Sequence, residues 1–410
     1  MQKVHNDFTE DSRTAPTGAI SAQRTRQQQK EVLRMTKKNG TNGHKSNGNI
    51  IGFPVGGRDG TKTDSESDKD TTRESAFAEA ERRTRQAEQG LSAGTDLTGS
   101  DSYVLEQALS SVMHLHAHTP DDAYTVRALG TEREGHGILI DDNGLVLTIG
   151  YLIVEADQVR LTTNQGQIIE GNVIAYDYDS GFGLVRAFDT PDIPVMPLGS
   201  SADLEIGQKM VLGGSGGRKN SVATKIFSIS EFVGSWEYKV KNAIFTFPAH
   251  PVWGGAALID EQGRLTGVAS LHVERIDEDG DMVAGNMTVP IDLLKPVMDD
   301  LTRLGRVNRP PRPWIGMLTA EAQEFLIVAE LVEGGPAEQA GVETGDIILA
   351  LNGHMVANLG DLYDRLWRLD PPDTFGGSHA NLTVYRDDET LEIDIKTANR
   401  YDFLKISRPH

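Results

Sequence analysis

The sequence contains no cysteine, so disulfide bonds, thiolate metal ligands and thiol nucleophiles are excluded. It also lacks any run of about 18 apolar residues, the length that a helix needs to cross a bilayer, and no membrane span is predicted. Basic residues number 40 against 60 acidic ones, and the net charge of −20 argues against nucleic acid as a partner. The chain does not open with the basic, apolar and small-residue succession of a secretory leader. The absence of this leader pattern predicts a cytoplasmic location, or a periplasmic one if the start or the export route is different.

The 410 residues include 43 glycines and 17 prolines, a proportion typical of many short strands separated by turns. At about 150 residues per domain, this length predicts two or three domains. The first hundred residues hold few large apolar side chains, with sixteen basic and fourteen acidic residues among them. Such a segment cannot bury enough apolar surface to offset the entropy lost on ordering. Residues 1–100 are therefore predicted to form a disordered polar tail.

Short strand patterns dominate the chain from residue 125 to residue 290. Apolar runs of four to eight residues alternate with Gly, Asn and Asp, and Asp142-Asn143-Gly144 is a strong hairpin signal. Regular strands without intervening helices indicate an all-β barrel or sandwich. The expected strands include Gly137–Ile140, Leu145–Thr148, Gln158–Thr162, Ile168–Tyr176, Leu184–Ala187, Lys209–Gly213, Ala243–Phe247, Ala257–Ile259 and Leu265–Ser270.

Helical patterns are few and lie around this strand-rich region. Helices are predicted at Tyr103–Ser110 and Ile291–Arg303, and two more, Ala337–Ala340 and Asp361–Leu369, lie in a last module that mixes strands and helices. The segment 304–313, between the strand-rich region and this last module, is rich in proline and is interpreted as a linker. The predicted domain plan is a tail over 1–100, a strand-rich domain over 101–303, a linker over 304–313, the mixed module over 314–400 and a C-terminal tail over 401–410.

Three histidines, His114, His116 and His118, alternate along one expected strand. Alternate residues of a strand point to the same face, and three imidazoles can hold zinc. Neighbours on that face are about 7 Å apart, however, which is too linear for a tetrahedral site without help from other strands. A solvated strand face is the favoured interpretation, and a metal site is the alternative.

Several motifs between about residue 110 and residue 400 resemble the high-temperature-requirement (HtrA) serine proteases. The resemblance implies a trypsin-like fold of two six-stranded β-barrels followed by a PDZ-like α+β domain. The barrel motifs are Gly135–Ile140, Asp142–Thr148, Asp192–Ser201, Leu204–Gln208, Gly263–Val268 and Val289–Ile291. The PDZ motifs are Gly335-Pro336-Ala337, Ala340-Gly341, Gly345–Ile348 and Leu351-Asn352-Gly353.

The resemblance also implies positions for a triad of serine, histidine and aspartate. The position of the base holds Tyr151, the position of the aspartate holds Gly181, and the position of the nucleophile holds Gly254. No histidine lies between His136 and His250, so a shifted alignment does not supply a base. A tyrosine hydroxyl, with an ordinary pKa of about 10, is a poor base at neutral pH. We therefore expect no catalytic residue at these positions.

The loop that would form the oxyanion hole is also expected to be impaired, because Val252 and Trp253 replace a glycine and a small polar residue of the family.

Gly213–Gly217 satisfies the G-x-S-x-G pattern around Ser215, but that pattern requires a strand, a turn and a helix. A strand-like stretch follows Ser215, and we interpret the pentapeptide as a barrel loop. The acidic run Asp277–Asp281 lacks the spacing of a calcium loop and is read as a hairpin tip. No metal and no cofactor is predicted.

The module over 314–400 offers a different chemistry. Trp314-Ile315-Gly316-Met317 is similar to the loop with which PDZ domains of this family hold a peptide carboxylate on backbone N–H groups. Strand Phe325–Ala329 is predicted to pair with the peptide, and the helix Asp361–Leu369 to form the other wall of the groove. The alternative is a groove filled by the chain's own tail or barrel.

These observations predict a catalytically degenerate HtrA-like protein that binds polypeptides, chiefly C-termini, in protein quality control or regulation. One alternative is an active serine endopeptidase with an unrecognised site, for which Ser215 is the candidate. Another is a regulatory or structural subunit that assembles with an active homologue, or a homo-oligomer.

Overall fold

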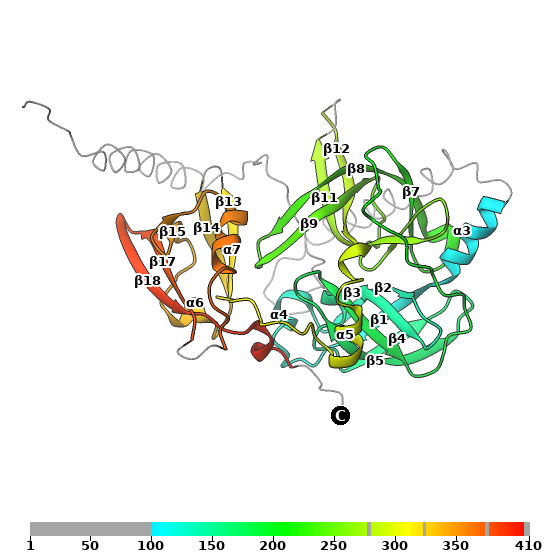
Figure 1. Ribbon diagram of the computed structural model, residues 1–410, viewed down its shortest axis with the longest axis horizontal. Coiled ribbons are helices and arrows are strands. Elements are labelled where there is room, and N and C mark those ends of the chain that lie inside the picture. The colour runs from blue at the N-terminus through cyan, green and yellow to red at the C-terminus, as the bar shows by residue number, and fades with distance from the viewer. Residues whose placement is uncertain (1–99, 277–279, 323–324, 374–376, 406–410) are drawn as a thin grey trace, which may run out of the picture. The chain divides into compact units, whose positions relative to one another are not determined.

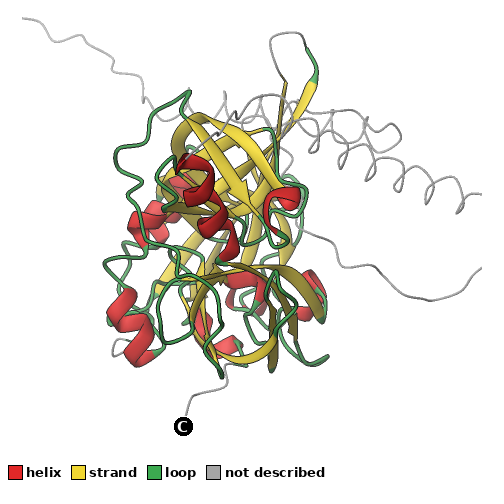
Figure 2. Cartoon of the chain, turned by 90° about the vertical axis from the view of Figure 1, so that its right-hand side faces the viewer, coloured by secondary structure: helices red, strands yellow, loops and turns green. Residues whose placement is uncertain are grey.

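The computed structural model describes residues 100–276, 280–322, 325–373 and 377–405, which all belong to one compact unit of the chain. Strands make up most of the regular structure and the helices are short (Figure 1, Figure 2). The expected mainly β fold class is confirmed. The predicted polar tail lies outside the described residues, apart from its last residue.

The first six strands are β1 (Val112–His118), β2 (Glu132–Leu139), β3 (Leu145–Ile149), β4 (Gln158–Thr162), β5 (Ile168–Tyr176) and β6 (Phe182–Ala187). They close into a barrel in the order β1-β2-β3-β6-β5-β4, with antiparallel neighbours. Apolar side chains alternate with polar ones along β1: Leu115 and Ala117 are fully buried, while the histidines between them face outward. The predicted Asp142–Gly144 turn joins β2 to β3 and is held by Asp141 Oδ1, which accepts from the amide of Leu145 at 2.8 Å.

The next six strands are β7 (Lys209–Gly213), β8 (Ser221–Gly234), β9 (Tyr238–Phe247), β10 (Ala257–Ile259), β11 (Leu265–Ile276) and β12 (Met282–Pro290). They close into a second barrel in the order β10-β11-β12-β9-β8-β7. Strands β8 and β9 form a long hairpin in which Gly234 pairs with Tyr238. The hairpin tip is therefore the three residues Ser235-Trp236-Glu237. Part of the acidic run at 277–281, on the β11–β12 hairpin, lies outside the described residues.

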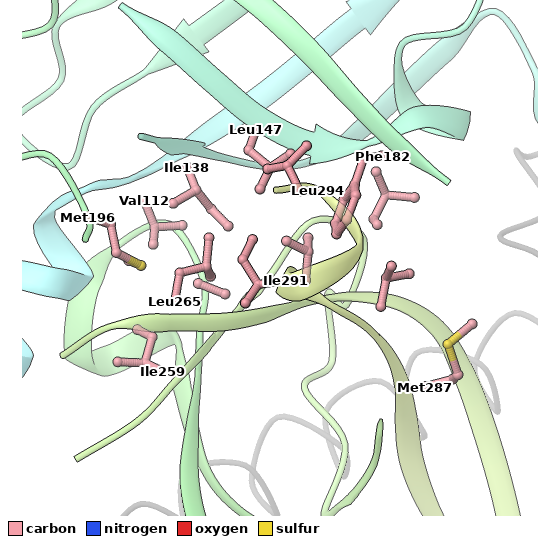
Figure 3. Packing of buried hydrophobic residues seen from close by; sticks show 14 of the residues in the cluster. Val112, Ile138, Leu147, Phe182, Met196, Ile259, Leu265, Met287, Ile291 and Leu294 are labelled. Carbon is pink, nitrogen blue, oxygen red and sulfur yellow. The ribbon is translucent and has the colours of Figure 1, made fainter. Parts of the chain in front are cut away.

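One apolar cluster joins the two barrels (Figure 3). Leu147 and Phe182 from the first barrel face Leu265 from the second and Ile291 beyond it, and all four are fully buried. Removing the ring of Phe182 by substitution with alanine is expected to cost about 3–5 kcal/mol. The space between the barrels is thus packed with side chains, and the segments that border it are held in place.

The helices around the barrels are α3 (Ser100–Ser110), α4 (Val126–Leu129) and α5 (Met298–Leu304), with 3₁₀ turns η1 (Gly150–Leu152), η2 (Gly217–Asn220) and η3 (Ile291–Leu293). The predicted helix at Tyr103–Ser110 is confirmed within α3. The single helix predicted at Ile291–Arg303 is wrong, because η3 and α5 are separate elements. Ile291 and Leu294 are drawn into the core between the barrels, and this packing overrides a continuous helix.

The C-terminal module has strands β13 (Met317–Ala322), β14 (Phe325–Leu331), β15 (Ile347–Leu351), β16 (His354–Met355), β17 (His379–Arg386) and β18 (Glu389–Lys396). Its helices are α6 (Pro336–Gln339), α7 (Leu359–Leu366) and the turn η4 (Arg400–Phe403). The sheet order is β13-β14-β15-β17-β18, with β16 paired to β15. Helix α7 begins at an Asn358 cap, whose side chain accepts from the amide of Asp361 at 2.8 Å. The module has its own apolar core, in which Leu362 and Val384 are fully buried.

Candidate functional site

Tyr151 and Gly254 meet between the two barrels. Tyr151 lies in η1, directly after β3, and its hydroxyl donates a hydrogen bond to the carbonyl of Ser270 on β11 at 2.8 Å. A Cβ atom placed on Gly254 would lie 2.9 Å from the same hydroxyl oxygen. The phenol therefore fills the space into which a side chain at position 254 would project. Burial raises the pKa of the Tyr151 phenol above its ordinary range, so it is neutral at physiological pH.

Gly181 lies next to the same turn, because its carbonyl accepts from the amide of Gly150 at 2.8 Å. Its backbone has φ +83°, a conformation that side chains disfavour, and a Cβ there would lie 2.6 Å from the hydroxyl of Tyr238. The nearby carboxylate of Asp177 is buried and accepts from the hydroxyl of Ser180 at 2.6 Å. The fold thus places the Tyr151 hydroxyl against Gly254 and the Tyr238 hydroxyl against Gly181, and Gly181 is bonded to the turn that carries Tyr151.

Two amides of the loop around Gly254 donate hydrogen bonds within the chain. The amide of Val252 donates to His250 Nδ1 at 3.1 Å, and the amide of Gly255 donates to the carbonyl of Ala269 at 2.9 Å. An oxyanion hole needs amides that point into an open site. Those of Val252 and Gly255 point at acceptors of the chain itself.

His136 and His250 form a buried pair with ring centroids 5.4 Å apart. His136 Nε2 donates to the carbonyl of Val252 at 2.8 Å, and Nδ1 accepts from the backbone amide of Ser215 at 3.1 Å. His250 Nε2 donates to the carbonyl of Asn220 at 2.7 Å. Burial lowers the pKa of both imidazoles, that of His136 to about 3. Both rings are therefore neutral, with both nitrogens of each engaged.

This pair bears on Ser215, which the sequence singled out as an alternative nucleophile. Ser215 is followed by the 3₁₀ turn η2 and then by β8, so the strand–turn–helix setting of a nucleophile elbow is not met. The contact with His136 uses the backbone of Ser215. In the described part of the chain, no hydrogen bond joins the Ser215 hydroxyl to an imidazole.

The loop Trp314–Met317 stands at the start of the C-terminal sheet and leads directly into β13. Gly316 has φ +75°, and a Cβ there would lie 3.0 Å from the ring of Trp314. The loop's carbonyls are turned into the fold: Gly316 O accepts from Val332 at 3.0 Å and Ile315 O from Ala337 at 2.8 Å. Because the carbonyls are fixed on one side, the amides of three successive residues converge on the other side.

The carboxylate of Glu237, at the tip of the β8–β9 hairpin, occupies that point of convergence. Its Oε1 accepts from the amides of Ile315 at 3.3 Å, Gly316 at 2.8 Å and Met317 at 3.4 Å. Burial raises the pKa of Glu237 to about 7, against the effect of Arg400 and of the amides themselves. Sequence reasoning did not single out Glu237, because nothing in its local pattern indicates a long-range contact.

The residues beside Glu237 contact both walls of the groove. The amide of Thr319 on β13 donates to the carbonyl of Ser235 at 2.9 Å. The Tyr363 hydroxyl on α7 donates to the carbonyl of Gly234 at 2.9 Å and accepts from the amide of Glu237 at 3.0 Å. The hairpin tip therefore lies between β13 and α7, held by backbone bonds on one side and by a tyrosine on the other.

The predicted pairing strand Phe325–Ala329 is wrong. That segment belongs to β14, whose neighbours on either side are β13 and β15, so it is not at the edge of the sheet. The strand that faces the groove is β13, because the loop around Gly316 runs straight into it. The predicted second wall, Asp361–Leu369, corresponds to α7, which begins two residues earlier, at Leu359.

The outward-facing histidines of β1 pair with carboxylates of neighbouring segments. His116 Nε2 lies 2.8 Å from Glu132 Oε2, and His118 Nδ1 lies 3.0 Å from Asp157 Oδ1. Among the described residues, no group of three or more His, Asp or Glu side chains is arranged to hold a metal ion. Across the same residues, no helix is both long and apolar enough to cross a membrane.

Two family models match this chain: residues 135–268 match the trypsin-like peptidase domain, and residues 313–397 match the PDZ domain. The chain therefore combines an HtrA/DegP-like trypsin-like peptidase domain with a PDZ domain. Among curated proteins it is 28% identical over 275 residues to a probable periplasmic serine endoprotease, DegP-like, from Pseudomonas fluorescens, covering 64% of this chain and 55% of that protein. A protein of the same name from Pseudomonas fulva is 26% identical over 287 residues, covering 65% of this chain and 57% of that protein.

Solved structures that this chain matches include the HtrA-type protease AlgW with a tripeptide, at 18% identity and a TM-score of 0.43, covering 73% of this chain and 97% of that one. Another is the serine endoprotease from Yersinia pestis, at 21% identity and a TM-score of 0.43, covering 74% of this chain and 99% of that one. The chain spans about half the length of the curated relatives that it matches.

Proposed function

We propose that this chain is a catalytically degenerate HtrA-like serine protease homologue that recognises polypeptide C-termini through its PDZ domain. The observation that carries the loss of catalysis is the contact between Tyr151 and Gly254, 2.9 Å from hydroxyl to Cβ position. A nucleophile at 254 would need the space that the phenol fills. A neutral phenol bonded to the Ser270 carbonyl is not a base for a serine.

Peptide recognition is supported by the loop at Ile315–Met317. Its three amides converge on one carboxylate oxygen, which is the arrangement that captures a C-terminal carboxylate in a backbone nest. Strand β13 offers its edge for an added strand, and α7 offers Tyr363 as a second hydrogen-bonding wall. The role that follows is binding of polypeptide ends in protein quality control or regulation.

The partner proposed here is therefore a protein or peptide with a free C-terminus. The curated relatives are named as periplasmic enzymes, and this favours the periplasmic alternative over the cytoplasmic one for the compartment. Their names also describe endoproteases, and on our account this chain has kept the binding function and lost the cleavage.

The loss of catalysis is tested by treating the full chain with a fluorophosphonate serine probe and with casein. An active DegP-like relative serves as the positive control, and Ser215→Ala is compared with the unchanged chain. We expect neither labelling nor casein hydrolysis. Stoichiometric labelling that disappears in Ser215→Ala would establish the alternative active site. Recovery of an active homologue with the inactive chain would favour a regulatory subunit.

A further inference from the structure

We infer that the hairpin tip Ser235–Glu237, together with the adjoining Gly234, is an internal ligand of the PDZ groove, with the side-chain carboxyl group of Glu237 in the place of a peptide C-terminus. This inference rests on the proposed function, because it concerns access to the same groove. It adds a regulatory step: an external C-terminus binds only when the hairpin tip leaves.

The first argument is that Glu237 and a peptide carboxylate would accept hydrogen bonds from the same amides. A peptide carboxylate held by the loop must accept from the amide of Gly316, and Glu237 Oε1 already lies 2.8 Å from that nitrogen. Two carboxyl groups cannot share one set of three amides, since each amide has one hydrogen and both groups would need the same position. Binding of Glu237 and binding of a peptide end are therefore mutually exclusive.

The second argument is that the tip imitates a peptide along its backbone and not only at its carboxylate. The carbonyl of Ser235 accepts from Thr319 on β13 at 2.9 Å, as an added strand does. Tyr363 bonds the carbonyl of Gly234 and the amide of Glu237, from the opposite wall. A chance side-chain contact would not reproduce this backbone pattern on both walls.

The third argument is the set of charged contacts that flank the tip. Lys239 on β9 lies 2.9 Å from Asp364 of α7 and 3.1 Å from Glu231 of β8, so it joins the hairpin to the helix. The guanidinium of Arg400 donates to the carbonyl of Trp236 at 3.2 Å. Glu237 itself has φ +56°, a left-handed conformation that a non-glycine residue adopts at a cost. A left-handed last residue is common in three-residue hairpin loops, so this conformation belongs to the turn itself.

The cost of displacing the tip lowers the apparent affinity for any peptide, because the competent state is only a fraction of the molecules. Removing the carboxyl group at position 237, as in Glu237→Ala, takes away the acceptor of the three amides and raises that fraction. The apparent affinity for a peptide with a free carboxylate should then rise by about tenfold while its intrinsic contacts stay the same.

The test compares the full chain with Glu237→Ala and Tyr363→Phe, two changes that remove contacts of the tip. Glu261→Gln, an exposed turn residue of the same barrel, is the matched control. The first readout needs no peptide: amide hydrogen exchange over the segment that contains Ile315–Met317. We expect faster exchange there in both tip variants and no change in Glu261→Gln.

The second readout is titration with a peptide that ends in an apolar residue with a free carboxylate. Tighter binding in Glu237→Ala than in the unchanged chain is the expected result. Equal exchange over Ile315–Met317 in all variants, or equal peptide affinity in the unchanged chain and Glu237→Ala, overturns the internal ligand. Faster exchange in the tip variants without binding of any peptide would leave the internal contact established and remove the proposed peptide recognition.

Discussion

The hydroxyl of Tyr151 lies 2.9 Å from the place that a Cβ on Gly254 would occupy, so the phenol leaves no room for a side chain at position 254. A side chain at 254 requires that the phenol move, and the phenol is fixed by its bond to Ser270. A serine placed at 254 alone therefore creates a steric conflict before it creates a nucleophile. This relationship is the basis of the first prediction.

Gly254→Ala should lower the free energy of unfolding by about 1–3 kcal/mol, as overpacking does in a tight site. In a Tyr151→Phe background the same change should cost less, because the obstructing oxygen is gone. Urea unfolding of the two single variants and the double variant measures this coupling. Strictly additive effects of the two substitutions would mean that the phenol does not limit position 254.

Gly181→Ala should destabilise the fold more than Gly166→Ala does. Both glycines have nearly the same left-handed backbone, φ +83° and +86°, but only at Gly181 would the Cβ meet an atom, the Tyr238 hydroxyl at 2.6 Å. The shared conformational penalty is about 1–2 kcal/mol, and the clash adds to it at 181. Thermal unfolding of the pair provides the comparison. An equal loss of stability in the two variants would show that the Tyr238 side chain moves away from a Cβ at position 181 without cost.

The buried histidines should make the protein less stable as the pH falls. His136 has an ordinary value of 6.5 and a folded pKa lowered to about 3 by burial, so the unfolded chain takes up a proton that the folded chain refuses. Above about pH 6.5, His136 does not lower the free energy of unfolding. Between about pH 6.5 and pH 3, the free energy of unfolding falls by up to about 1.4 kcal/mol per pH unit because of this group. Urea titrations at several pH values should show a shallower dependence for His136→Gln than for the exposed control His354→Gln. The same slope in both would contradict the assignment.

Peptide binding should tighten as the pH rises toward neutrality. Glu237 has a pKa raised to about 7 in the groove, against an ordinary value of 4.5 when the tip has left. Glu237 thus binds a proton more tightly in the groove than after the tip has left. Occupation of the groove by the tip is therefore strongest below about pH 4.5 and weakens as the pH rises to about 7. Of the charged and titratable groups that face Glu237, Arg400 favours the ionised form. The tyrosines Tyr363 and Tyr124 have pKa values that burial raises above their ordinary range, so they stay neutral.

The measurement is peptide affinity between pH 5 and pH 8 in the unchanged chain and in Glu237→Gln. Several-fold tightening is expected in the former and a flat profile in the latter. A matching slope in Glu237→Gln would place the titrating group elsewhere.

The sequence was sufficient to predict the strands and turns because these depend on local patterns. Alternation placed the histidines of β1 outward, and Asp142-Asn143-Gly144 marked a turn that the structure contains. The positions Tyr151 and Gly254 were related through a family resemblance, and the structure places them side by side. Their roles stay predictions until activity is measured.

What the sequence did not predict depends on contacts between distant segments. Glu237 reaches Gly316 across 79 positions of the chain, and no periodicity or turn signal encodes that contact. The helix expected at Ile291–Arg303 is divided because Ile291 and Leu294 are drawn into the core between the barrels. In each case, tertiary packing determines an outcome that local propensity leaves open.

The most direct test of the central claim is calorimetric titration of the full chain at pH 8 with two versions of one peptide, one ending in a free carboxylate and one amidated, followed by mass spectrometry of the recovered peptide. Because the amides of Ile315–Met317 hold a charged group, the account predicts that amidation weakens binding by about tenfold or more. It also predicts that the peptide is recovered intact. Equal affinity for the two versions, or recovery of cleaved peptide, would contradict the account.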